Sequence, residues 1–127
     1  MQSVEGVVVN DDVNRLLETS EILNSQVLSL TRCVILALLA YFVDGVQYRE
    51  LKASLKISDG KLISNLKLLK KLGYVEKNEV EVDRKKIDVY SLNPKGRNEL
   101  NKIIEWMKII EKVAKEGDEK CQITLTK

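Results

Sequence analysis

The spacing of apolar residues predicts that most of the chain is helical. From Val13 to Leu30 a mostly apolar seam has alternating intervals of three and four residues, which favours a helix over a strand; its members are Val13, Leu16, Ser20, Leu23, Val27 and Leu30. Asp11 and Asp12 offer N-cap carboxylates for this helix, and Thr31 can cap the next one. That second helix, over 32–42, is apolar nearly all round, so we expect it at the domain centre.

The next segment has the pattern of a helix-turn-helix. Val46 and Gln47 begin a short extended piece, and two leucines four residues apart indicate a helix over 48–55. Ser58 and the acid after it give an N-cap signal for a helix over 60–72, which the glycine that follows can end. Two helices joined by a short turn form this motif.

Beyond this motif the period changes to two. The apolar positions over 74–82 and 87–92 alternate like two strands, and the polar residues between them form a hairpin tip. Asn93 as N-cap and Pro94 at the first helical position start a last helix, which Gly117 can end. The predicted fold class is therefore mainly α with a small antiparallel β-hairpin (α+β).

Length and composition indicate one domain. The chain has 127 residues, of which 44% are hydrophobic and 31% charged, which is typical of a single packed core. The expected parts are a flexible N-terminus over 1–10, a single domain over 11–116 and a C-terminal tail over 117–127. Within that domain we expect an N-terminal helix over 11–30, a core over 31–92 and a C-terminal helix over 93–116.

Several residue types are too scarce for common kinds of site. The chain has no His, and its two Cys, Cys33 and Cys121, lie far apart, so we expect neither a metal site nor a cofactor. No nucleophile–base pair or glycine-rich phosphate loop is present, so we do not expect an enzyme. The start lacks a basic signal-peptide region, and the uncharged run 33–43 is too short to span a membrane. We expect a soluble, cytoplasmic protein.

The net charge of +2 conceals an uneven distribution. Residues 1–30 contain five acids and one base, whereas residues 55–72 contain five lysines and one acid. On a helical wheel, Gly60, Ser64, Lys67 and Lys71 fall opposite the leucines of the 60–72 helix. Small and basic residues on one face suit a recognition helix, although a lysine-rich face is also common on any solvated helix. The basic hairpin tip favours DNA binding over a plain solvated face.

Residues 31–100 resemble the winged helix-turn-helix regulators of the MarR and ArsR type. The resemblance rests on TRCVILALL, YREL, ISDGKLISNL, LKKLGYV and, after the hairpin, YSLNPKGR. It implies that the 58–72 helix enters the major groove of double-stranded DNA and that the hairpin is a wing on the backbone or in the minor groove. The implied DNA-binding residues are Ser58, Gly60, Lys61, Ser64, Asn65, Lys67 and Lys71 on the helix, and Arg84, Lys85 and Lys86 on the wing.

The resemblance also implies a homodimer joined by the flanking terminal helices. Both helices carry apolar stripes that a core of this size does not need, although they can also pack within one chain. The candidate interface residues are Leu16, Leu23, Val27, Leu30, Leu100, Ile103, Trp106, Met107 and Ile110. With no Cys pair, no His and few Arg or aromatic residues near these helices, we expect neither metal sensing nor a small-molecule effector.

The predicted function is therefore that of a dimeric, sequence-specific DNA-binding transcriptional regulator. The alternative is a winged-helix protein–protein interaction module within a transcription complex or another assembly, in which the lysine face would only contact solvent. Replacing lysines and arginines on the helix and hairpin distinguishes the two hypotheses.

Overall fold

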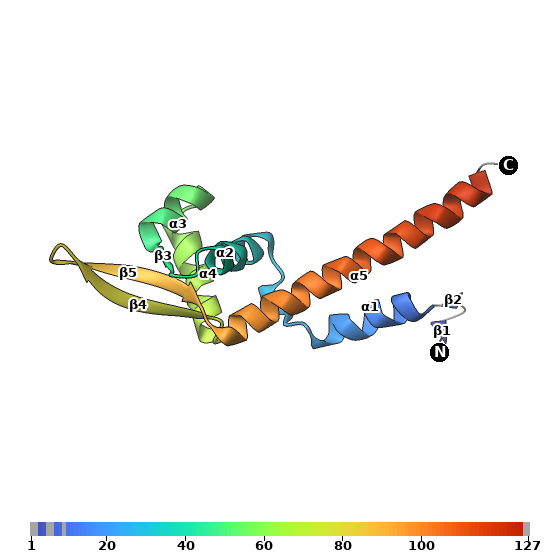
Figure 1. The fold of residues 1–127 in the computed structure, drawn as a ribbon, viewed down its shortest axis with the longest axis horizontal. Coiled ribbons are helices and arrows are strands. Elements are labelled where there is room, and N and C mark those ends of the chain that lie inside the picture. The colour runs from blue at the N-terminus through green and yellow to red at the C-terminus, as the bar shows by residue number, and fades with distance from the viewer. Residues whose placement is uncertain (1–2, 5–6, 9, 126–127) are drawn as a thin grey trace. The chain divides into compact units, whose positions relative to one another are not determined.

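The computed structural model describes residues 3–4, 7–8 and 10–125, which belong to two compact units (Figure 1). The central unit is Asn24–Leu100, and the terminal unit combines Met1–Leu23 with Asn101–Lys127. No described helix is both long enough and apolar enough to cross a membrane. The single domain expected over 11–116 stays a prediction, and the two units are described in turn.

The core of the central unit lies among three helices. These are α2 (Leu30–Tyr41), α3 (Tyr48–Leu55) and α4 (Asp59–Lys71), preceded by a short 3-10 helix, η1 (Ser25–Val27). Each helix turns leucines or isoleucines inward, and their side chains are almost fully buried. The residues that form this core are Val27, Ile35, Leu36, Leu39, Leu51, Leu62, Leu66 and Leu69.

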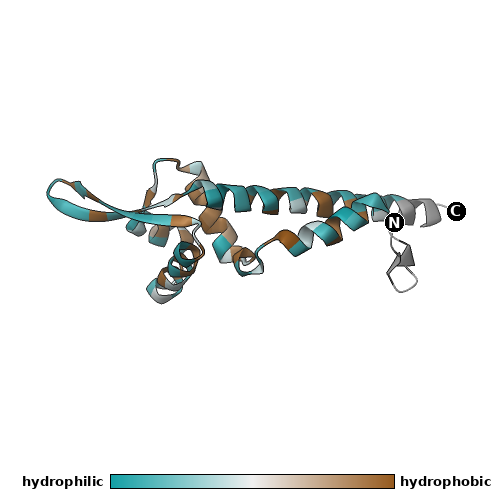
Figure 2. Cartoon of the chain, turned by 90° about the horizontal axis from the view of Figure 1, so that it is seen from below, coloured by the Kyte–Doolittle hydropathy of each residue, from teal (hydrophilic) through white to brown (hydrophobic). Residues whose placement is uncertain are grey.

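A three-stranded antiparallel sheet completes the central unit. Its strands are β3 (Val46–Gln47), β4 (Val75–Val82) and β5 (Lys85–Leu92), in the order β3-β5-β4. The fold class is confirmed as α+β, with the short extended piece before α3 serving as the third strand. We call the β4–β5 hairpin the wing; most of its length is hydrophilic (Figure 2).

The first helix is shorter than the predicted 11–30 element. Helix α1 is Asp11–Ile22, and its N-cap is Asn10, whose side chain accepts a hydrogen bond from Val13 N, rather than either aspartate. Asn24 then caps η1 through Gln26 N at 3.0 Å. Polar side chains that bond to nearby backbone N–H groups compete with helix continuation, so the apolar seam does not remain one helix.

The cap of α2 also differs from the prediction. Ser29, rather than Thr31, is the N-cap, because its hydroxyl oxygen accepts a hydrogen bond from Arg32 N at 3.1 Å. Both residues have a hydroxyl group and differ by two positions, so the apolar pattern alone does not choose between them. The core face of α2 is unaffected by this shift.

The last helix is longer than predicted. Helix α5 is Pro94–Leu125, and its start is as expected, since Asn93 Oδ1 accepts a hydrogen bond from Gly96 N at 2.8 Å. It continues through Gly117, where the 93–116 helix was expected to end and a tail to begin. A glycine inside a helix costs only about 1 kcal/mol relative to Ala, so it does not have to stop one.

The predicted flexible segment 1–10 falls largely outside the described residues. Of that segment, Ser3–Val4 (β1) and Val7–Val8 (β2) form a small antiparallel pair.

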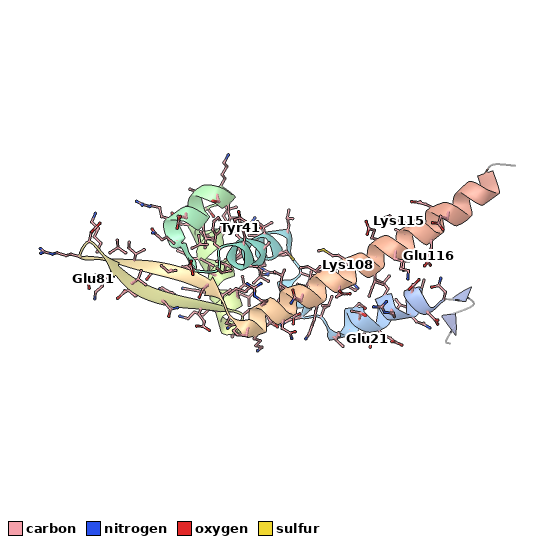
Figure 3. All side chains as sticks on the ribbon, viewed as in Figure 1. Glu21, Tyr41, Glu81, Lys108, Lys115 and Glu116 are labelled. Atoms are coloured by element: carbon pink, nitrogen blue, oxygen red, sulfur yellow. The ribbon has the colours of Figure 1, made fainter. Side chains whose placement is uncertain are left out.

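In the terminal unit, α1 is bonded to the C-terminal half of α5. Asn10 Nδ2 donates to Glu116 Oε2 at 2.9 Å, and Lys112 Nζ lies 3.2 Å from Asp12 Oδ1. Figure 3 labels Glu116 on α5. Several large apolar side chains of this unit nevertheless stay at least 38% exposed. They are Leu17, Ile22, Ile104, Met107 and Ile110.

We expect this helix pairing to weaken in acid. Hydrogen bonding to Glu116, together with Lys112, holds the pKa of Asp12 below its usual range. A lowered folded-state pKa stabilises the fold above the unfolded value near 3.9, and this contribution is lost as the pH falls through the folded value. Circular dichroism between pH 7 and pH 2 should show an Asp12→Asn variant losing less thermal stability in acid than the parent chain. An equal change in the exposed control Asp11→Asn would contradict this.

Candidate nucleic-acid interface

The two helices of the helix-turn-helix are fixed to each other at their starts. Tyr48 in the first turn of α3 donates its hydroxyl hydrogen to Asp59 Oδ1 in the first turn of α4, at 2.8 Å. This hydrogen bond to Asp59 raises the pKa of Tyr48. The turn between the helices includes Lys56 in the left-handed region, with φ 54°, and Ser58 then caps α4 by accepting from Lys61 N at 3.1 Å. The orientation of α4 is therefore set by side-chain bonds as well as by its leucines.

The outward face of α4 is the one predicted by the helical wheel. Gly60, Ser64, Lys67 and Lys71 are all exposed, and Lys61 lies beside them. A Cβ added at Gly60 would meet no atom within 4 Å, and Ser64 is small, so no large side chain of these two positions protrudes at the N-terminal end of the face. These properties allow close approach to the edges of base pairs.

The charge of this face is not neutralised by neighbours. Among the described residues, Lys61, Lys67 and Lys71 have no ion-pair partner. Residues 48–71 contain seven basic residues and only two acids, Glu50 and Asp59. Both carboxylates are already engaged, since Glu50 accepts from Gln47 N and Asp59 accepts from Tyr48. The helix-turn-helix surface is therefore strongly positive.

The structure corrects the prediction for Asn65. Its side chain is only 7% exposed and points inward, where Oδ1 accepts from Arg32 Nη1 at 2.9 Å and Nδ2 donates to Lys61 O at 2.8 Å. A buried amide with these two partners is not available to a base edge. Asn65 is thus a bridge between α2 and α4 rather than a groove-side residue.

We expect an Asn65→Ala variant to lose stability rather than base preference. The truncation leaves the Arg32 guanidinium without its acceptor, and Arg32 Nε is already buried without a hydrogen-bond partner among the described residues. The expected cost is about 1–3 kcal/mol of unfolding free energy. Urea denaturation measures this cost, and selection from a random duplex pool measures base preference. A changed preferred sequence at parental stability would restore Asn65 to the DNA-contacting set.

The wing is less basic than its tip suggests. Residues 75–92 contain five acids and four bases, and Lys86 Nζ lies 3.8 Å from Glu79 Oε1 while Lys77 Nζ lies 3.5 Å from Asp88 Oδ2. The register places Lys85 opposite Val82 and Lys86 opposite Glu81, so these two lysines project from opposite faces. Glu81 on the wing is labelled in Figure 3. The DNA contacts predicted for Arg84, Lys85 and Lys86 remain predictions. Of the three, Lys86 has its charge partly neutralised, by Glu79.

The turn at the wing tip has an uncommon backbone. Asp83 and Arg84 both have positive φ, at 50° and 65°. A two-residue hairpin loop requires this geometry, and asparagine or glycine usually supplies it. Arg84 therefore keeps a long cationic side chain at the very tip, at a conformational cost of about 1 kcal/mol.

Two residues near the α4 surface were missed by the sequence analysis. Ile63 is 41% exposed and follows Gly60 by one turn, so its methyl groups extend the outward face. Lys70 lies next to it, and both line a cavity of about 350 Å³ between α3, α4 and the wing. The helical wheel could have predicted that Ile63 is on the outward face, because it falls only about 40° from Lys67.

The predicted dimer residues differ in their burial. Four of them are at most 9% exposed within one chain: Leu23, Val27, Leu100 and Ile103. Val27 is 0% exposed, so it has no surface left for a second chain. Leu16 and Trp106 are half-buried, whereas Leu30, Met107 and Ile110 are exposed. Only part of the predicted set is free to contact a partner, and its role stays a prediction.

A family model described as a winged helix DNA-binding domain matches residues 31–126, and thus most of the chain. The chain belongs to the winged-helix DNA-binding domain family. The resemblance of residues 31–100 to winged-helix regulators is therefore confirmed. In this family's terms, α3 and α4 are the helix-turn-helix and the β4–β5 hairpin is the wing (Figure 1).

Solved structures share this fold at low sequence identity. YusO from Bacillus subtilis is 17% identical, with a TM-score of 0.63 over 91% of this chain and 82% of its own. A Staphylococcus aureus MepR variant bound to an oligodeoxyribonucleotide is 13% identical, with a TM-score of 0.62 over 91% of this chain and 86% of its own. A PadR-like transcription factor from Bacteroides fragilis is 22% identical, with a TM-score of 0.54 over 82% and 97%. Comparison with curated protein sequences gives no match.

Proposed function

We propose that this winged-helix protein is a sequence-specific, double-stranded DNA-binding transcriptional regulator that acts as a homodimer. The observation that carries the proposal is the outward face of α4, where exposed lysines without ion-pair partners flank two small residues. The oligodeoxyribonucleotide bound to the MepR variant, which shares the fold, supports the same kind of ligand.

In the proposed mechanism, α4 lies in the major groove and the wing follows the backbone. Lys67 and Lys71 neutralise phosphates and release counterions, which supplies affinity without sequence information. Ser64 and Lys61 near the start of α4 hydrogen-bond base edges, and the exposed methyl groups of Ile63 suit the C5-methyl group of thymine. Arg84 and Lys85 at the wing tip add backbone or minor-groove contacts.

Two observations in the terminal unit support the homodimer. Met107 and Ile110 on α5 are exposed together with Leu17 and Ile22 on α1, and this amount of apolar surface favours burial against a second copy. Trp106 beside them is half-buried, so part of its ring is also open to a partner chain.

The alternative function, a protein–protein interaction module, makes a different prediction for the same variant. Replacing Lys61, Lys67, Arg84 and Lys85 together with Ala removes DNA retention under the proposed function. Under the alternative, the variant retains whatever the parent retains, because those side chains only contact solvent. Circular dichroism of the variant verifies that the fold is intact.

The salt dependence of duplex binding tests the proposal directly. If about six phosphates are contacted per dimer, the logarithm of the association constant should fall with the logarithm of the salt concentration with a slope of about −5. Fluorescence anisotropy with a labelled duplex, between about 50 and 300 mM salt, gives this slope. An affinity independent of salt, or negligible binding at low salt, would overturn the DNA-binding function.

A further inference from the structure

Helix α2 has an apolar stripe on the side that faces away from its own core. Leu30 is 84% exposed, Val34 38% and Tyr41 78%, and Ala37 between them is exposed as well. Their spacing of four, three and four residues aligns them along one line of the helix, as in a coiled-coil seam. Tyr41, at the end of this stripe, is labelled in Figure 3.

The charged residue of α2 lies on the opposite side from that expected of an ordinary surface helix. Its one charged residue is Arg32, and the Arg32 guanidinium is on the core side, bonded to Asn65 Oδ1 at 2.9 Å. A solvated helix normally turns its charges outward and its apolar residues inward. The outer face of α2 therefore suits neither water nor a nucleic acid, and it has no charge with which to select a charged protein.

The spacing of the stripe is the same in both directions along the helix. If two copies of α2 pair antiparallel about a two-fold axis, Val34 faces Ala37 of the second copy near the axis. Leu30 then faces Tyr41 of the second copy at each end. A small residue at the centre allows the two backbones to approach, and the large residues at the ends cover the seam. A surface that is complementary to itself in this way fits an isologous contact.

We propose that the α2 stripe is a self-association surface, which pairs antiparallel with the same helix of a second copy of this chain. This contact uses a different helix from the homodimer proposed through α1 and α5, and it assigns Leu30 to the pairing of α2 rather than to that homodimer. It does not depend on DNA binding. Phe42 and Val43, which are 48% and 72% exposed directly after α2, extend the apolar surface at each end. Four side chains from each copy form a small interface, so the association is weak and should require high protein concentration.

Sedimentation velocity at about 1 µM to about 1 mM protein tests the proposal. The parent chain should form species larger than any formed by an Ala37→Glu variant, because this substitution places a carboxylate in each half of the seam. Ala53→Glu is the matched control, since it makes the same change at an exposed alanine of α3 in the same unit. It should keep the parental association, whereas Ala37→Glu should weaken it at least about tenfold. Equal association constants for Ala37→Glu and the parent chain would overturn the proposal.

Disulfide cross-linking identifies which residues meet. In a chain with Cys33→Ala and Cys121→Ser, an equimolar mixture of Val34→Cys and Ala37→Cys chains should cross-link at least about tenfold faster than either alone. Faster cross-linking of each variant with itself would indicate parallel pairing and overturn the antiparallel arrangement. No cross-linking at either position, as expected if α2 packs on a terminal helix instead, would also overturn it.

The outcome is distinguishable from failure of the proposed function. Met107→Glu, on α5, should remove the homodimer step and leave the α2 step in place. Ala37→Glu should bind a duplex with one site as tightly as the parent, since Ala37 lies outside the α4 face. If the parent chain bound no duplex DNA, the proposed regulator function would be rejected, while the sedimentation test of the α2 contact would remain valid.

Discussion

Reversing the charge of Lys67 and Lys71 together should lower the affinity for duplex DNA by at least about a hundredfold at moderate salt. Both side chains are exposed, lie one turn apart on the outward face of α4 and have no ion-pair partner among the described residues. Each reversal removes an attraction to phosphate and adds a repulsion, and a dimer contains four such positions. The salt dependence should become shallower by about one unit of slope for each phosphate contact that is lost.

A matched control separates a local contact from the effect of total charge. Lys108→Glu combined with Lys115→Glu changes the net charge equally, but on α5 in the terminal unit, where both lysines are labelled in Figure 3. Anisotropy titrations of both double variants should show nearly parental binding by the α5 pair. If both pairs lost affinity equally, the α4 face would not be the contact surface.

The largest expected effect on stability is at Gly96. This residue is buried in the first turn of α5, where a Cβ would overlap the carbonyl oxygen of Tyr74 and lie 2.6 Å from Leu92 Cδ1. The Tyr74 backbone cannot move away easily, because Asn93 N donates to Tyr74 O at 3.2 Å and Asn93 Nδ2 donates to Gly73 O at 2.6 Å. Gly96→Ala should therefore cost at least about 2 kcal/mol of unfolding free energy.

The chain contains a suitable glycine for comparison. A Cβ added at Gly60 meets nothing within 4 Å, so Gly60→Ala should be neutral or stabilise the fold by up to about 1 kcal/mol. Urea denaturation followed by circular dichroism compares the two variants. A Gly96→Ala variant with parental stability would mean that α5 can shift away from the Tyr74 carbonyl group, contrary to our account.

Sequence periodicity predicted the central unit better than the ends of the helices. The leucines of α4 specify their core face directly, and the wheel correctly placed Gly60, Ser64, Lys67 and Lys71 on the outside. The predicted end of α1 was wrong because the apolar seam continues past Ile22, while the side chains of Asn24 and Ser29 cap new helices and redirect the backbone. A hydrophobic pattern reports which side chains need burial, but local side-chain bonds decide where a helix stops.

The candidate site shows a similar limit. Asn65 lies at the boundary of the wheel, and its direction depends on Arg32, which is distant in sequence and contributes the bonding partner. The acids of the wing were visible in the sequence, but the pairing of Lys86 with Glu79 depends on the register of β4 and β5. Contacts between elements therefore determine which of the predicted residues stay free.

The bridge between Arg32 and Asn65 has a consequence for evolution. A change at only one of the two positions leaves a polar group in the interior without its partner, so each single step passes through a less stable intermediate. We therefore expect the two positions to covary among related sequences. Lineages that lose the amide at position 65 should also have replaced the arginine at position 32.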